Sequence, residues 1–255
     1  MAATQISGIN RPHRLHSLFL LLLCGLLLGG CAAIAGDKNN YVLKVMVQEP
    51  RTKIAKPPLL LMLHGYGSNE ADLFDLARYL PDSFLIVSVR APYDMGNGGY
   101  KWYDIGLAPG TRFANTEQTQ ASAGKVLQLI KQLKAHYTYN PARVFVSGFS
   151  QGAAMSLVLG LNNPDVFRGA IILSGRTITD MMPATADPKK FAGFNLLLIH
   201  GTQDQVLSIT YGNETDTLLK KLGIRHEYYT YPIPHTINGD VVNTMNKWLR
   251  TGTGK

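Results

Sequence analysis

The sequence predicts one α/β domain built on a mostly parallel β-sheet. Short apolar runs that suit buried strands alternate with segments of helical periodicity from residue 41 to residue 250. This alternation is typical of α/β proteins. The run at 59–63 (LLLML) is apolar at every position, as are strands covered on both faces of a parallel sheet. No linker divides residues 41–250, so we expect a single domain there.

Length and composition exclude several other classes of protein. The 255 residues are 45% apolar and 16% charged, and they include two cysteines. A chain of this size buries enough surface to need no covalent staples. Two cysteines are too few for a disulfide scaffold, and such sparse charge excludes a disordered chain. The formal charge of +8 comes from lysines and arginines scattered along the chain. Because they form no stripe interleaved with aromatic residues, we expect no nucleic-acid partner.

The first part of the domain is expected to alternate strands with one helix. Asn69 is a suitable N-cap for that helix, and Pro81 ends it. In order, the expected elements are an edge strand at 41–48, a buried strand at 59–63, a helix at 70–80 and a strand at 84–89.

Residues 92–115 are expected to form a long irregular loop. The segment is rich in glycine, yet it contains Trp102 and Tyr103. Loops of this length in a compact domain usually carry function, so the loop is a candidate border of a binding site.

The remaining elements continue the alternation. The clearest helix places one apolar face on Ala123, Val126, Leu127, Ile130 and Leu133. The expected elements are helix 116–137, strand 143–147, a helix that starts within 153–160, strands 170–173 and 196–200, helix 210–222, strand 226–231 and helix 239–250.

The first thirty residues have the pattern of a secretory signal peptide. Arg11 and Arg14 precede an apolar run at 18–28, which is too short to span a bilayer. The run ends in Leu-Gly-Gly-Cys31, which resembles the bacterial lipobox and implies cleavage before Cys31 and acylation of its thiol. The alternative is an ordinary signal peptide with Cys31 nearby by chance. Loss of the two arginines lowers the formal charge by two, to +6.

This processing divides the chain and predicts its location. Residues 1–30 would be removed, 31–40 would form a tether, 41–250 the domain and 251–255 a C-terminal tail. Acyl chains on Cys31 would hold the protein at a membrane of the bacterial cell envelope. Ala32 replaces the aspartate that retains enterobacterial lipoproteins at the inner membrane, which favours the outer membrane where one exists.

The segment 148–152 (GFSQG) fits the pattern Gly-x-Ser-x-Gly. It lies between a β-branched strand and a helix start, which is the context of a nucleophile elbow. Its glycines permit the tight turn that exposes Ser150 above the sheet. Ser150 is therefore the candidate nucleophile, and it needs a base to take its proton.

Asp204 and His235 are the candidate partners of Ser150. The order Ser, Asp, His is that of the α/β-hydrolase triad, and both residues follow expected strands. His235 would move the proton while Asp204 orients the imidazole. The rival residues lack the position or the order, and they are Asp180, Asp187, Asp216, Asp240, His136, His200 and His226.

An acyl-transfer site also needs two amides for the oxyanion. We expect the N–H of Gln151, directly after the nucleophile, and the N–H of Tyr66, in the loop after the first buried strand. The Tyr66 side chain would either line the acyl pocket or face solvent.

Together these motifs resemble the phospholipase/carboxylesterase family of α/β-hydrolases, which includes the acyl-protein thioesterases. The resemblance rests on LMLHGYGS (61–68), KWYDIG (101–106), GFSQGA (148–153), HGTQDQV (200–206) and PHTI (234–237). It implies a single domain with helices on both faces of the sheet and no large cap domain. It also implies hydrolysis of carboxylic esters or thioesters without a cofactor or a metal.

The resemblance further suggests where a substrate would lie. Trp102 becomes a candidate pocket residue, with a place in the core as the alternative. Met181 and Met182 could border the pocket or simply pack. Tyr66 and Ser68 depart from the leucine and aspartate that are frequent in the family, which weakens the inference to acyl-protein substrates.

The leading interpretation is a lipid-anchored serine carboxylesterase that acts on small or medium acyl esters, with thioesters and lysophospholipids as further candidates. An exported polyester depolymerase or aromatic-ester hydrolase would share the same triad. A non-catalytic envelope lipoprotein on a hydrolase scaffold is the third interpretation, and the intact motifs argue against it.

Overall fold

The computed structural model describes residues 40–108 and 111–251. The predicted signal peptide, Cys31 and the tether before residue 40 lie outside the described residues, as do residues 252–255. None of the described helices combines the length and the apolar character that crossing a bilayer requires.

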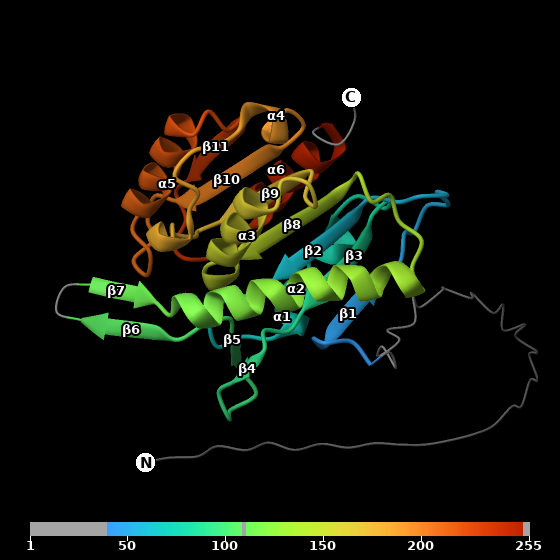
Figure 1. The fold of residues 1–255 in the computed structure, drawn as a ribbon, viewed down its shortest axis with the longest axis horizontal. Coiled ribbons are helices and arrows are strands. Elements are labelled where there is room, and N and C mark those ends of the chain that lie inside the picture. The colour runs from blue at the N-terminus through green and yellow to red at the C-terminus, as the bar shows by residue number, and fades with distance from the viewer. Residues whose placement is uncertain (1–39, 109–110, 252–255) are drawn as a thin grey trace, which may run out of the picture. The chain divides into compact units, whose positions relative to one another are not determined.

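Seven strands form a central sheet in the order β1-β3-β2-β8-β9-β10-β11 (Figure 1). β1 is antiparallel to β3, and every other neighbouring pair is parallel. The predicted α/β fold with a mostly parallel sheet is thereby confirmed. The strands are β1 (Val45–Gln48), β2 (Leu59–Leu63), β3 (Leu85–Val89), β8 (Val144–Phe149), β9 (Gly169–Leu173), β10 (Asn195–Gly201) and β11 (His226–Tyr231).

Helices cover both faces of this sheet. In β2, Leu59, Leu61 and Leu63 pack into one hydrophobic core, while Leu60 and Met62 pack into the other. A strand buried on both sides needs apolar residues at every position, which explains its sequence. The first core is covered by α2 (Thr116–His136), α3 (Gln151–Asn162) and α5 (Ile209–Lys221), and the second by α1 (Glu70–Phe74) and α6 (Gly239–Thr251). In Figure 1, α2 and α3 lie in front of the sheet.

Two elements of the N-terminal part are shorter than the sequence predicts. β1 begins at Val45 rather than at residue 41, because the Val42 amide donates to Gln132 on α2 instead of to the sheet (2.9 Å). The expected helix at 70–80 is α1 followed by a separate 3₁₀ turn, η1 (Ala77–Tyr79). Leu80 is extended, as a residue before proline prefers to be. The predicted N-cap is confirmed, since the Asn69 side chain accepts from the Ala71 amide.

The segment 92–115 is more ordered than the loop that the sequence predicts. It contains two small antiparallel sheets, β4 (Tyr93–Asp94) with β5 (Tyr100–Lys101), and β6 (Ile105–Ala108) with β7 (Thr111–Ala114). Gly96 and Gly98 have positive φ angles in the turn between β4 and β5, which is the role that glycine fills most readily. Strands this short carry no periodic signal.

Two further short elements have no counterpart in the sequence prediction. They are η2 (Thr179–Met181) and α4 (Pro188–Phe191), each of about one turn. The other expected helices and strands are present, with ends that differ by a few residues.

Candidate active site

Ser150 occupies a sharp turn between β8 and α3. Its backbone has φ 54° and ψ −113°, a conformation that residues with a Cβ rarely adopt. The turn is held because the Ser150 amide donates to the carbonyl of Leu173 on β9 (2.9 Å). The geometry of a nucleophile elbow, expected from the sequence, is therefore present.

The two glycines that flank Ser150 allow close backbone approach. A Cβ on Gly148 would lie 2.2 Å from the carbonyl carbon of Gly152, and a Cβ on Gly152 would lie 2.0 Å from the carbonyl oxygen of Leu63. No side chain fits in either place. The Gly152 contact also fixes the end of β2, where the loop that contains Tyr66 begins.

We therefore expect Gly152→Ala to destabilise the protein by about 3 kcal/mol or more, because backbone must move to admit the methyl group. Gly124→Ala is the matched control: Gly124 is exposed within α2, and a Cβ there would meet nothing within 4 Å. The control should gain about 1 kcal/mol from helix propensity. Thermal unfolding measures both variants. A Gly152→Ala protein as stable as wild type would contradict the close approach.

Asp204 and His235 meet at the carboxyl edge of the sheet. Asp204 follows β10 and His235 follows β11, and these neighbouring strands are parallel. His235 Nδ1 lies 2.6 Å from Asp204 Oδ2. The other carboxylate oxygen of Asp204 accepts the amides of Val206 (2.9 Å) and Leu207 (2.8 Å). The Asp204 side chain is fully buried, so its direction is fixed by these three contacts.

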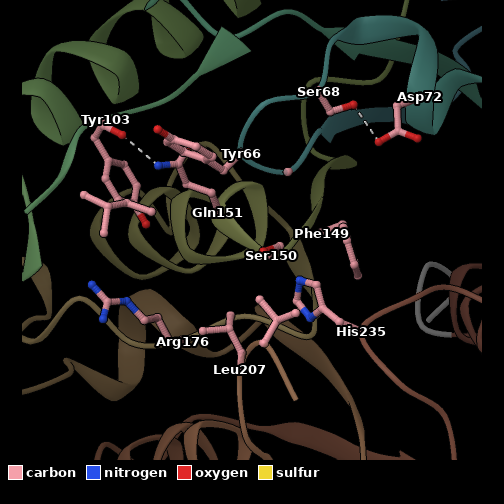
Figure 2. Close-up of a pocket in the computed structure, with 13 residues that line it drawn as sticks. Tyr66, Ser68, Asp72, Tyr103, Phe149, Ser150, Gln151, Arg176, Leu207 and His235 are labelled. Carbon is pink, nitrogen blue, oxygen red and sulfur yellow. Dashed lines mark hydrogen bonds between the residues drawn. The ribbon is translucent and has the colours of Figure 1, made fainter. Parts of the chain in front are cut away.

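His235 and Ser150 line the same cavity, as Figure 2 shows. The His235 ring packs against the ring of Phe149, with centroids 4.7 Å apart. Since Nδ1 faces Asp204, the Nε2 edge is the one left for the serine side. The structure thus brings the three predicted triad residues to one place.

The two expected oxyanion amides flank the nucleophile. Gln151 is the first residue of α3, so its N–H has no acceptor within the helix. Among the residues that the structure describes, no backbone acceptor faces the amide of Tyr66. Both residues line the cavity with Ser150. Tyr66 is 46% exposed and therefore lies at the mouth of the cavity.

His64 supports the loop that carries Tyr66. Its Nε2 accepts the Ala91 amide (3.0 Å), and its Nδ1 lies 2.7 Å from the carbonyl oxygen of Gly65. The indole N–H of Trp102 donates to the His64 carbonyl (2.9 Å). These contacts tie the loop to β3 and to the segment after β5.

The Gln151 side chain has a role that the sequence did not indicate. Its Oε1 accepts the amide of Trp102 and its Nε2 donates to the carbonyl of Tyr103, both at 2.8 Å. The first residue after the nucleophile therefore clamps the segment after β5 against the elbow. The sequence predicts only a backbone role for Gln151, through its N–H.

The cavity has a volume of about 330 Å³, within the usual range for small-molecule sites. Its apolar lining includes Tyr66, Tyr103, Ile105, Phe149, Val206 and Leu207, and Arg176 also lines it.

Neither of the predicted pocket side chains lines this cavity. Trp102 is fully buried and belongs to the core, whereas its neighbour Tyr103 lines the cavity. The chain bends at these two residues, just after β5, and their side chains enter different surroundings. Met181 packs against the core and does not reach the lining.

Two fully buried histidines, His64 and His200, lie near the site but do not belong to the triad. Burial lowers the pKa of both His64 and His200, because a charged imidazole would lose its hydration. His200 Nε2 lies 2.8 Å from the carbonyl oxygen of Leu207 and 3.6 Å from Asp204 Oδ2.

Acid should therefore destabilise the fold. Below about pH 6.5 these histidines take up protons in the unfolded chain but stay neutral in the folded one, so the free energy of unfolding falls as pH falls. The slope is at most about 1.4 kcal/mol per pH unit for each histidine. Thermal unfolding from pH 7.5 to pH 5 should show the decline, and His200→Gln should flatten it. His136→Gln, which changes an exposed histidine, should leave it unchanged; an unaltered slope in His200→Gln would refute the assignment.

Within residues 40–108 and 111–251, no group of three or more His, Cys, Asp or Glu side chains is arranged to hold a metal ion.

Comparison with known proteins gives a consistent result. The family described as phospholipase/carboxylesterase matches residues 44–253. An acyl-protein thioesterase 1 of Mycosarcoma maydis is 31% identical over 232 residues, covering 82% of this chain and 96% of the relative. Carboxylesterase SOBER1 of Arabidopsis thaliana is 28% identical over 204 residues, covering 75% and 89%. A carboxylesterase structure from Mesorhizobium loti superposes with a TM-score of 0.72 at 22% identity, covering 83% of this chain and 96% of that one.

Proposed function

The chain belongs to the phospholipase/carboxylesterase family and is a serine hydrolase of the α/β-hydrolase fold, and from this premise we propose that it hydrolyses carboxylic esters through a Ser150–His235–Asp204 triad. The observation that carries the proposal is the 2.6 Å contact between His235 and the buried Asp204, beside a serine held in a strained turn. Small and medium acyl esters are the proposed substrates, because the cavity is modest in size and largely apolar.

In the first half of the proposed reaction, Ser150 Oγ attacks the ester carbonyl while His235 Nε2 takes its proton. The carboxylate of Asp204 holds the Nδ1–H tautomer and stabilises the imidazolium. The carbonyl oxygen becomes an oxyanion, which the amides of Gln151 and Tyr66 receive. The tetrahedral intermediate then collapses, and His235 gives the proton to the departing alcohol.

In the second half, water attacks the acyl-enzyme with His235 again acting as base. The acid leaves, and Ser150 recovers its proton. The α3 N-terminus favours negative charge at the same place in both halves, since its first amides point toward the nucleophile.

The test uses protein that starts at Ala32, with initial rates on p-nitrophenyl esters from acetate to palmitate. We expect an optimum at short or medium chains and covalent labelling by a fluorophosphonate, with the label on Ser150 in the digested protein. An optimum at long acyl chains would indicate membrane lipids, rather than small esters, as the substrates. A protein that neither turns over any ester nor accepts the label would overturn it.

We also propose that acyl chains on Cys31 anchor the protein to the cell envelope, with the outer membrane favoured. The support is the sequence Leu-Gly-Gly-Cys31 after an apolar run of signal-peptide length. Two or more acyl chains give stable membrane attachment, whereas one chain is marginal.

The prediction for Cys31→Ser is release from the membrane fraction and loss of labelling by an alkyne fatty acid fed to the bacterial host. Cys24→Ser, which changes a cysteine inside the signal, should leave both unchanged. An unlabelled wild-type protein that fractionates with soluble envelope proteins would contradict the anchor.

A further inference from the structure

Arg176 brings a positive charge into a largely apolar cavity. It follows β9 through Ser174, which has φ 47°, and Gly175, where a Cβ would lie 2.6 Å from the Cβ of Ala153. This tight turn packs the chain against α3 and directs Arg176 to the cavity, which it lines together with Ser150. Figure 2 shows the guanidinium on the same side of the cavity as Tyr103.

Tyr103 is the neighbour of the Arg176 guanidinium at this end. The two side chains share a hydrogen bond, and burial raises the pKa of Tyr103 to about 12. The phenol is therefore neutral at ordinary pH and adds no negative charge beside the guanidinium. The backbone of Tyr103 is itself fixed by Gln151 Nε2 (2.8 Å).

The position of His235 decides which part of an ester reaches Arg176. His235 must give its proton to the leaving oxygen, so the alcohol lies on the His235 side of Ser150. A second cavity of about 200 Å³ continues on that side, with Phe149, Thr236 and Ile237 in its wall. The acyl chain is then expected at the other end of the cavity, where Figure 2 places Tyr103 and Arg176.

The apolar lining of the cavity strengthens an ion pair that Arg176 forms with a ligand. Tyr66, Ile105, Val206 and Leu207 supply apolar surface to the cavity that Arg176 also lines. An ion pair formed among apolar side chains is less screened than one in water. A guanidinium also matches a carboxylate with two parallel hydrogen bonds.

We propose that Arg176 binds a carboxylate at the far end of the acyl chain, so that the enzyme favours half-esters of dicarboxylic acids over neutral esters of equal length. This inference rests on the proposed esterase function and names its substrate class. An all-apolar acyl pocket would show no such preference.

The test compares mono-p-nitrophenyl adipate and suberate with p-nitrophenyl hexanoate and octanoate. The measured quantity is the ratio of kcat/KM for each carboxylate ester to that of its neutral partner. Arg176→Met should lower this ratio roughly tenfold to hundredfold, the loss typical of a hydrogen bond between charged groups. Arg176→Lys keeps the charge but loses the paired hydrogen bonds, so its ratio should be intermediate.

Arg225→Met is the matched control, because it removes the same charge from an exposed residue just before β11, at the opposite edge of the sheet. Its ratio should equal that of wild type. Added salt should lower the wild-type ratio and leave that of Arg176→Met unchanged.

The outcomes separate this inference from the proposed function. If wild type hydrolyses octanoate but Arg176→Met leaves the ratio unchanged, the carboxylate site is refuted and the esterase stands. If Arg176→Met lowered kcat/KM equally for the carboxylate ester and its neutral partner, Arg176 would only support Tyr103, and the carboxylate site would again be refuted. If wild type hydrolyses neither ester and rejects a fluorophosphonate, the proposed function itself fails.

Discussion

Ser150→Ala is expected to lower kcat for p-nitrophenyl butyrate by about 10⁶, the loss seen when a triad nucleophile is removed. The variant keeps the Cβ and its strained backbone, so the turn between β8 and α3 has no new clash to relieve. The amides of Gln151 and Tyr66 remain, and they should leave a residual acceleration of roughly 10³ to 10⁴ over water. Initial rates at high enzyme concentration measure both quantities.

The controls for this prediction concern the fold. Ser150→Ala should unfold at the same temperature as wild type, because the Ser150 hydroxyl makes no protein hydrogen bond among the described residues. Ser156→Ala should affect stability rather than activity. The buried Ser156 hydroxyl donates to the Gly152 carbonyl within α3 (2.9 Å). That variant should lose about 1 kcal/mol of stability and keep most of its activity. A Ser150→Ala enzyme with near-wild-type rates would remove Ser150 from the mechanism.

Local pattern was enough to predict most of the fold. The strands β2 and β11 match the predicted ranges, and the other main strands differ by a few residues. Each is a short run rich in apolar, β-branched or aromatic residues and bounded by turn residues, which is a strong signal. The two-residue strands of segment 92–115 have no such signal, since their order comes from the glycine turn and from contacts with distant loops.

The candidate site likewise has a part that the sequence predicts and a part that it does not. Ser150, Asp204 and His235 could be placed because parallel strands bring their following loops to one edge. The two hydrogen bonds of the Gln151 side chain join residues that lie far apart in sequence, and no local pattern predicts them. Arg176 belongs to no motif, so the sequence does not identify it as a site residue. Its importance comes from the cavity, which only the assembled loops form.

Asp204→Asn should lower kcat by about 10⁴ while leaving the fold almost intact. The asparagine Oδ1 can still accept the amides of Val206 and Leu207. Its amide group, however, would face His235 Nδ1 with a donor where a carboxylate oxygen now accepts. The imidazole would then turn to the other tautomer, with its proton on Nε2, and could not accept the proton of Ser150.

Asp216→Asn separates this effect from the general loss of an aspartate–histidine pair. Asp216 Oδ1 lies 2.9 Å from His226 Nε2, outside the cavity, and burial of the pair is only partial. Its substitution should change stability slightly and kcat by less than about twofold. Asp204→Ala should lose stability as well as activity, because two partly buried amides lose their acceptor. If Asp204→Asn retained wild-type kcat, the short contact to His235 would be structural, and another group would have to orient the base.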